Sequence, residues 1–171
     1  FNFLTVNEYI FSGAQKFDNV IKSLLLYGGK DVFAYIRDKM IVSKEGIKNS
    51  ILNNAVLLIS KDVKQLLSII ITNYPEMQND LLNILPDDST KNYYLKSLFS
   101  YDPKYKITLD EDILKTYITY LCVYYPSEVR KFLTIYEGNI SIHNYLETCK
   151  KYKIYDACAM ISYRLGDMND F

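Results

Sequence analysis

The side chain best suited to catalysis in this chain is His143, its only histidine. A nucleophilic centre needs such a base beside a serine or cysteine, and Cys149 follows six residues later. That separation does not place two side chains on one helical face, where neighbours are three or four residues apart. His143 also stands near an expected helix start, so the sequence favours a capping or surface role for it.

Two other patterns resemble ligand sites. Residues 27–31 (YGGKD) suggest phosphate binding, but they lack the G-x-x-x-x-G-K-[ST] spacing and no strand is expected before them, so the glycines predict a helix end. The carboxylates of residues 110–112 fall in the first turn of an expected helix, where the helix dipole favours negative charge. Asp167 and Asp170 lack the other oxygen ligands of a calcium loop. We therefore predict no catalytic residue, no metal site and no cofactor.

Tyrosine is abundant, and three tyrosines share one stripe of an expected helix: Tyr117, Tyr120 and Tyr124. Aromatic side chains with a polar end are enriched at protein interfaces. They suit the boundary between core and solvent equally well. The stripe is therefore a candidate protein interface, and a role at the boundary between core and solvent stays open.

The one local basic run is Lys150, Lys151 and Lys153. Each lysine near an anionic membrane surface would add about 1 kcal/mol of attraction, so this run is a candidate contact for acidic lipids. The alternative, which we favour, is a helix C-terminus that carries cations. Lys+Arg and Asp+Glu are equal at 20 each, so there is no overall basic field of the kind that collects nucleic acid.

The remaining composition indicates a packed helical protein. About half the residues are apolar, and no apolar run approaches the ~20 residues of a membrane span. The three cysteines, Cys122, Cys149 and Cys158, lack C-x-x-C spacing and predict buried thiols in a reducing compartment. Because the chain begins at Phe1 rather than Met and ends at Phe171 just after a helix stop, we expect a segment of a longer protein.

The elements that position these residues are short helices, because apolar residues recur with a period near 3.6 and alternating stretches are absent. Expected helices cover residues 18–26, 31–40, 45–58, 61–73, 75–85 and 111–124, one around 93–98, and three between 124 and 168. In the helix expected over residues 61–73, the side chains predicted to face the core include Ile71. Expected boundary signals are Ser60, Ser89 or Thr90, the box Thr108–Glu111, Pro126, Ser141 and Gly166.

Helices this short are marginal alone, so each must bury its apolar stripe on helices close by in the chain. The prediction is an all-α fold, an α-solenoid of stacked antiparallel short helices, formed by residues 1–171 as one segment. Ala157 lies among small residues and allows close approach of the preceding helix.

The last part of the chain resembles the clathrin heavy-chain repeat. The residues that carry the resemblance are 146–152 (LETCKKY), 156–157 (DA) and 164–167 (RLGD). They are most similar to the repeats of vacuolar protein sorting subunits in the HOPS and CORVET tethering complexes. Residues 31–36, 94–99 and 117–133 are similar to the same subunits, in the same order.

The resemblance implies a non-enzymatic scaffold in endosome-to-vacuole or lysosome transport. It implies contacts with other tethering subunits, contacts of the full-length parent with Rab GTPases and SNARE proteins, and peripheral attachment to late endosomal, vacuolar or lysosomal membranes from the cytoplasm. Self-association stays open, as does the choice between HOPS and CORVET types. The alternatives are a clathrin coat segment and, in another class, an enzyme or an RNA-binding helical repeat.

Overall fold

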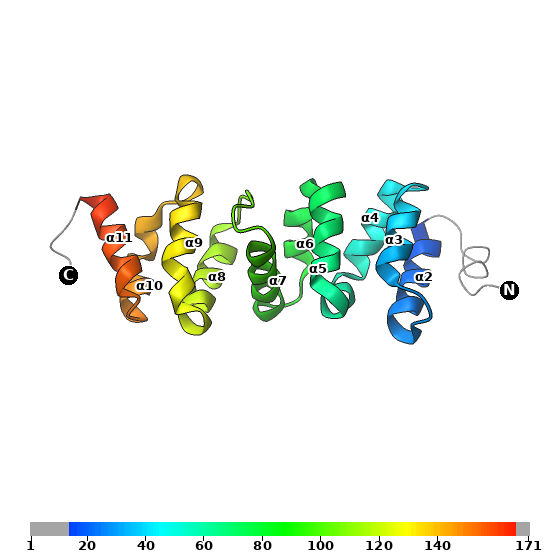
Figure 1. The fold of residues 1–171 in the computed structure, drawn as a ribbon, viewed down its shortest axis with the longest axis horizontal. Coiled ribbons are helices and arrows are strands. Elements are labelled where there is room, and N and C mark those ends of the chain that lie inside the picture. The colour runs from blue at the N-terminus through cyan, green and yellow to red at the C-terminus, as the bar shows by residue number, and fades with distance from the viewer. Residues whose placement is uncertain (1–13, 167–171) are drawn as a thin grey trace. The chain divides into compact units, whose positions relative to one another are not determined.

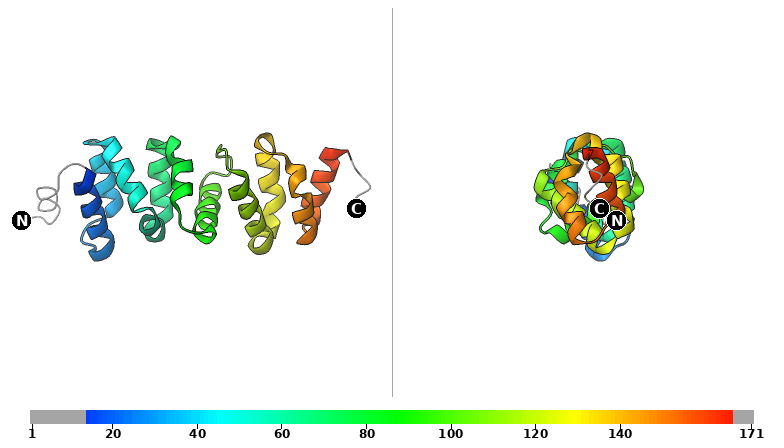
Figure 2. Two further views of the ribbon diagram at one scale, coloured as in Figure 1. Left: turned by 180° about the vertical axis from the view of Figure 1, so that it is seen from behind. Right: turned by 90° about the vertical axis from the view of Figure 1, so that its left-hand side faces the viewer.

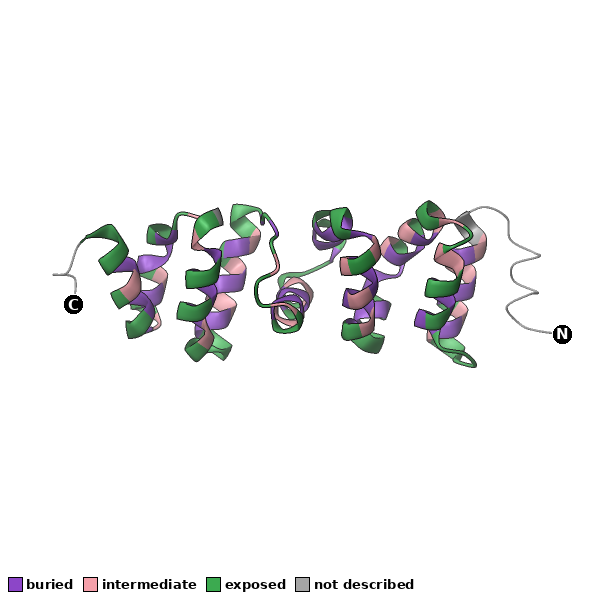
Figure 3. Ribbon diagram, turned by 45° about the horizontal axis from the view of Figure 1, so that its top comes forward, coloured by how far each residue is buried: buried purple, intermediate pink, exposed green. Residues whose placement is uncertain are grey.

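The computed structural model describes residues 14–166, and within that range all regular secondary structure is helical, with ten α-helices and no strand (Figure 1). The chain divides into two compact units, the first ending at Thr90 and the second beginning at Lys91. The all-α prediction is therefore confirmed. In both units the buried residues follow one side of each helix and the exposed residues the other, as the 3.6-residue period requires (Figure 3).

The first unit contains α2 (Ala14–Tyr27), α3 (Val32–Met40), α4 (Lys44–Asn53), α5 (Ala55–Asn73), the 3₁₀ turn η1 (Pro75–Met77) and α6 (Gln78–Ile84). Helices α2, α3 and α4 lie side by side (Figure 1 and Figure 2). Gly46 allows the close approach of α2 and α4, since a Cβ there would lie 3.0 Å from the Phe17 ring. The Tyr74 hydroxyl, beyond α5, donates 2.8 Å to the Lys44 carbonyl.

The helix expected over residues 45–58 is interrupted at Asn54, which separates α4 from α5. Asn54 is 3% exposed, and its side-chain amide donates 2.7 Å to the Asp18 carboxylate and 2.8 Å to the Ser50 carbonyl. These two bonds hold Asn54 out of helical geometry (φ −118°, ψ 19°). The apolar period alone could not show this break because Ile51, Ala55 and Leu58 keep their spacing across it.

Ser60 does not cap the next helix, contrary to the expectation. It lies inside α5, and the backbone leaves helical geometry two residues later, at Asp62 (φ −166°, ψ 94°). The Asp62 carboxylate accepts 3.2 Å from the Gln65 N–H, the position an N-cap satisfies. On the helix that follows, Ile69 is buried instead of Ile71.

The proline and glycine signals in the first unit are confirmed. Pro75 opens η1, and the helix continues as α6. Gly28 and Gly29 both have positive φ, of 75° and 98°, and the Gly28 N–H donates 3.0 Å to the Leu24 carbonyl. The YGGKD run therefore ends α2, and Asp31 caps α3 by accepting 2.9 Å from the Phe33 N–H.

The second unit contains most of α7 (Asp88–Tyr101), then α8 (Glu111–Tyr124), η2 (Pro126–Glu128), α9 (Val129–Tyr136), η3 (Glu137–Asn139), η4 (Ile142–Tyr145), α10 (Leu146–Lys151) and α11 (Tyr155–Leu165). Helix α9 packs on α8 and α11, and α10 packs on α11. As in the first unit, the main contacts join helices close together in the chain.

Two expected caps, at the starts of α7 and α8, are wrong by a few residues. Helix α8 is capped by Asp110, whose carboxylate accepts 3.1 Å from the Asp112 N–H, and not by Thr108. Helix α7 begins at Asp88, ahead of Ser89 and Thr90, and Asp87 accepts 2.7 Å from the Thr90 N–H. In each case an aspartate of the same polar run accepts the backbone hydrogen bond that the predicted serine or threonine was expected to accept.

Ser141 is in the cap position of η4 but makes no side-chain cap hydrogen bond. Two other boundary signals in this unit are confirmed: Pro126 opens η2, and Gly166 is left-handed (φ 74°) after α11.

Helix α10 ends at a left-handed residue that is not glycine, which the sequence analysis did not predict. Lys153 has a left-handed backbone (φ 59°), a conformation that glycine adopts at least cost. Its N–H donates 3.1 Å to the Lys150 carbonyl, and the Ile154 N–H donates 2.9 Å to the Cys149 carbonyl. This pair of bonds is the Schellman motif, with lysine where glycine is usual.

Candidate interaction surfaces

The predicted tyrosine stripe lies on α8, and packing divides it between core and surface. Tyr117 is only 1% exposed and its ring centroid is 5.7 Å from that of Phe99 and 5.2 Å from that of Phe132. Tyr117 therefore belongs to the aromatic core of the second unit and does not share the exposed face that Tyr124 presents. Burial also holds the pKa of its hydroxyl well above the usual range.

The outer part of the stripe, Tyr120 and Tyr124, forms together with Tyr125 what we call the tyrosine surface. The Tyr120 ring centroid lies 5.1 Å from that of Tyr124 and 5.7 Å from that of Tyr125. Tyr124 is 68% exposed and Tyr125 39%. Burial, followed by a hydrogen bond with Tyr125, raises the pKa of Tyr120 to about 12. Three contacting rings, two of them open to solvent, are a surface that a protein partner can cover.

The three lysines of the candidate lipid contact lie at the C-terminal end of α10 and just beyond it. Lys150 and Lys151 are in its last turn, where cations are favoured by the carbonyl end of a helix. Lys150 pairs with Glu147 at 3.7 Å, and the Lys151 ammonium is 5.3 Å from the Tyr152 ring centroid. All three side chains are exposed, as either role requires.

The structure does not bring His143 and Cys149 together, and it gives the acidic residues at the start of α8 roles in capping and hydrogen bonding. His143 is exposed in η4, whereas Cys149 is fully buried in α10, so a substrate that reaches one does not reach the other. Asp110 caps α8, and Glu111 accepts a 2.9 Å hydrogen bond from the Tyr145 hydroxyl. Within residues 14–166, no group of three or more His, Cys, Asp or Glu side chains has metal-site geometry.

The three cysteines are free and buried, as predicted. Cys122 of α8 and Cys149 of α10 are hydrogen-bonded to each other, a contact that their separation in sequence could not indicate. That bond, followed by burial, holds the pKa of Cys149 well above its usual range, and burial raises that of Cys158. A raised pKa keeps the Cys149 and Cys158 thiols protonated and unreactive, whereas the hydrogen bond with Cys149 lowers the pKa of Cys122.

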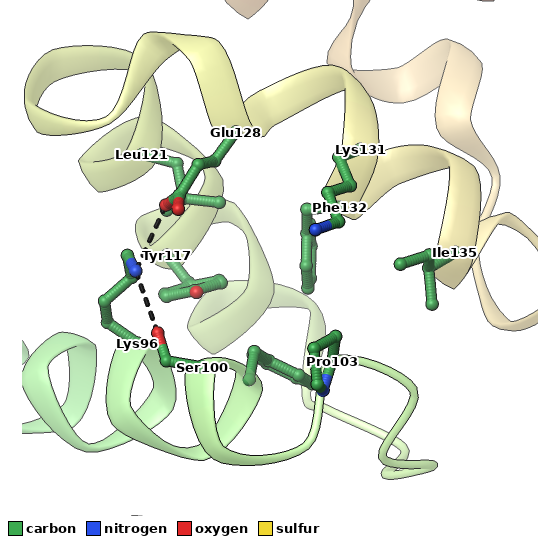
Figure 4. A pocket seen from close by; sticks show the side chains of 10 residues that line it. Lys96, Ser100, Pro103, Tyr117, Leu121, Glu128, Lys131, Phe132 and Ile135 are labelled. Atoms are coloured by element: carbon green, nitrogen blue, oxygen red, sulfur yellow. Dashed lines mark hydrogen bonds and ion pairs between the residues drawn. The ribbon is translucent and has the colours of Figure 1, made fainter.

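A further feature, missed by the sequence reasoning, is a groove on the second unit that we call the Tyr117 groove. It encloses about 280 Å³ and is lined by Lys96, Phe99, Ser100, Pro103, Tyr117, Leu121, Glu128, Lys131, Phe132 and Ile135. Lys96 and Ser100 line one side, Phe132 and Ile135 the other, and Tyr117 lies between them (Figure 4). The residues come from α7, α8, α9 and the adjoining segments, so only tertiary packing assembles them.

The groove carries two lysines, Lys96 and Lys131, and among the residues that the structure describes only Lys96 is paired with a carboxylate. The Lys96 ammonium is 3.1 Å from the Glu128 carboxylate and 2.9 Å from the Ser100 hydroxyl, and it lies 4.6 Å from the Tyr125 ring centroid. Lys131 is exposed and makes no ion pair with any carboxylate in the described part of the chain.

Comparisons of the chain with protein-family models, with curated proteins and with solved structures found no match. The tyrosine surface and the Tyr117 groove are therefore interpreted from their own geometry.

Proposed function

We propose that this chain is a non-enzymatic scaffold segment of a membrane-tethering subunit in endosome-to-vacuole or lysosome transport. The subunit is of the HOPS type, most like vacuolar protein sorting-associated protein 41, with the CORVET type close behind. The helices stack as an α-solenoid, and the segment acts by holding partners at fixed spacing. It works at the cytoplasmic face of late endosomes, vacuoles or lysosomes as a peripheral component.

The observation that carries the proposal is the structure of the segment with the clearest resemblance, residues 146–166. Its two blocks form α10 and α11, which pack on each other. Cys149 and Ala157 are completely buried, so these small residues of the motif lie in the core of the second unit. Gly166 has the left-handed backbone that ends α11. Cys149, Ala157 and Gly166 of the motif thus have physical roles in a helical hairpin, which supports the proposal.

The local pattern of packing supports the solenoid. In each unit the main contacts join helices no more than four elements apart in the chain. A solenoid needs nothing else, since each repeat is stabilised by its neighbours. Prolines recur at matching positions: Pro75 follows Tyr74 after α5, and Pro126 follows Tyr125 after α8. Both open a 3₁₀ turn that leads into the next helix.

In this proposal the tyrosine surface contacts another subunit of the complex. Tyr124 and Tyr125 are rigid, amphipathic side chains whose burial would supply binding energy at small conformational cost. The basic end of α10 is the candidate contact for acidic lipid headgroups. No helix in residues 14–166 is both long and apolar enough to cross a bilayer.

The test is to tag the full-length parent in its native cell and identify the proteins that co-purify. Shared tethering-core subunits with a late-endosomal Rab support the HOPS type, and an early-endosomal Rab supports the CORVET type. Clathrin light chains and adaptors would instead identify a coat protein. Recovery of no trafficking protein would overturn the proposal.

A variant of the same parent tests the tyrosine surface. Tyr124→Lys should remove at least one co-purifying subunit because it places a charge among apolar contacts. Tyr163→Lys is the matched control: Tyr163 of α11 is similarly exposed, at 64%, and lies outside the tyrosine surface. Equal loss from both variants, or loss from neither, would argue against a specific role for Tyr124.

A further inference from the structure

We infer that the Tyr117 groove binds a short segment of a partner protein that presents a bulky apolar side chain next to an aspartate or glutamate. The inference concerns the second unit alone. It does not depend on the tethering proposal, because the groove would bind such a segment in any complex.

The size of the groove selects the class of occupant. Sites for small molecules and cofactors commonly enclose about 300–1,000 Å³, and this groove encloses about 280 Å³. One or two side chains fit this space better than a nucleotide or a large cofactor does. A peptide satisfies this limit because only its anchoring side chain needs to enter, while the rest stays on the surface.

The walls select an apolar anchor. Phe99, Leu121 and Phe132 are buried residues with part of their surface on the groove, and Ile135 at its edge is 38% exposed. Pro103 completes this wall. Rings and branched aliphatic chains that already pack against one another form a rigid surface, so an incoming leucine or phenylalanine does not have to order it.

The polar groups select an acidic neighbour for that anchor. Lys96 is held by Glu128 and Ser100, whereas Lys131 has no carboxylate partner among the described residues, which leaves one unpaired positive charge at the groove. The Tyr117 hydroxyl is turned into the space between Lys96 and Phe132 and makes no hydrogen bond with the other lining residues (Figure 4). Because Tyr117 is only 1% exposed, its hydroxyl is not a contact for the bound segment, and Lys131 is the group that meets the carboxylate.

These features act together. The apolar wall supplies affinity by removing the anchor from water, and Lys131 discriminates by charge. A basic segment would meet Lys131 with like charge and would be rejected. The groove is therefore specific for one arrangement of side chains on the partner, an apolar anchor with a carboxylate beside it.

The test is selection of binding peptides from a phage-displayed library of random short peptides against the 171-residue chain. Enriched peptides should share an apolar side chain within two residues of aspartate or glutamate. Their synthetic versions, labelled with fluorescein, are then titrated by fluorescence polarisation. Enrichment of basic peptides, or recovery of none that bind, would overturn the inference.

Variants locate the binding. Lys131→Ala should weaken the selected peptides about 2- to 5-fold, the range for an exposed ion pair, and Lys131→Glu about tenfold through like-charge repulsion. Ile135→Ala should weaken them about fivefold through lost apolar contact. Lys115→Glu is the matched control: Lys115 is exposed on α8 and does not line this groove, so the same charge change should leave affinity within twofold.

The pattern across these variants decides the outcome. Equal weakening by Lys131→Glu and Lys115→Glu would show attraction to overall charge instead of a site, and would overturn the inference. Unchanged binding to Ile135→Ala and Lys131→Glu would place the peptides elsewhere, with the same consequence. All three substituted side chains are on the surface, so each variant should fold, and thermal unfolding followed by circular dichroism checks this.

Discussion

The hydroxyl of Tyr145 donates a 2.9 Å hydrogen bond to the carboxylate of Glu111, joining the turn η4 to the first residue of α8. The two residues are 34 positions apart. A second tyrosine hydroxyl also ties this region together: that of Tyr136 in α9 donates to the carbonyl of Ile107 in the segment before α8. Two tyrosines that the stripe analysis did not consider thus fix the start of α8, the helix that carries both candidate surfaces.

Tyr145→Phe should destabilise the chain by about 1.5 kcal/mol. The substitution keeps the ring, which is buried, and removes only the hydroxyl, so the loss reports a hydrogen bond to a charged group, commonly about 1.5–3 kcal/mol when buried. We place it at the low end because Glu111 is exposed. Urea unfolding followed by circular dichroism measures the change in free energy.

A double-mutant cycle identifies the partner. If the bond is the one described, Glu111→Gln and Tyr145→Phe together should cost less than the sum of the two single changes. Strict additivity would mean that the two side chains do not interact in solution.

Asp62→Ala should destabilise α5 by about 0.5–2 kcal/mol, because Asp62 is the N-cap of the helix that follows it. Ser60→Ala should change the free energy of unfolding by less than about 0.5 kcal/mol, as for most exposed positions. Both are single truncations two residues apart, so each controls for the other. A larger effect at Ser60 would contradict the geometry found here.

These cap positions show how far the sequence alone could go. The 3.6-residue period and the proline and glycine signals predicted where helices lie, because apolar stripes and the special backbones of Pro75, Pro126 and Gly166 are local properties. Caps were displaced by a residue or two since Ser, Thr and Asp side chains crowd each boundary and propensity does not choose among them. The break at Asn54 depends on a contact with Asp18, 36 residues away, which no local pattern encodes.

Lys153→Gly should stabilise the chain by about 0.5–1 kcal/mol. The left-handed conformation costs a non-glycine residue roughly 1–2 kcal/mol, and relief of that cost exceeds the extra entropy glycine gives the unfolded chain. Lys150→Gly removes the same charge from a helical position in the last turn of α10, where glycine costs about 0.5–1 kcal/mol. Thermal unfolding should therefore shift in opposite directions for the two variants, and a shift in the same direction would contradict the prediction.

The candidate surfaces were predictable only in part, for a similar reason. The spacing of Tyr117, Tyr120 and Tyr124 predicted one helical stripe correctly. Which end of that stripe is buried depends on Phe99 and Phe132, which come from α7 and α9. The Tyr117 groove exists because those same helices pack around α8, so its lining could not be assembled from the sequence.

The stability of the chain should fall between about pH 10 and pH 12, and Tyr136 should account for part of the fall. Burial raises the pKa of Tyr136 from 10.0 to about 12. The folded state thus holds a proton that the unfolded state releases first. This contribution is complete below pH 10 and is lost as the pH rises through 12.

Tyr136→Phe isolates that contribution. At neutral pH the variant should be less stable by about 1 kcal/mol because the hydrogen bond to Ile107 is gone. It has no proton to lose, so its deficit relative to the natural chain should shrink as the pH rises from 10 to 12. Lysines also titrate in this range, but they are common to both proteins and cancel in the difference. Phe132→Leu perturbs the same cluster, where its ring centroid lies 5.1 Å from that of Tyr136, and its deficit should stay constant with pH. A constant deficit for Tyr136→Phe would show that its hydroxyl titrates alike in both states.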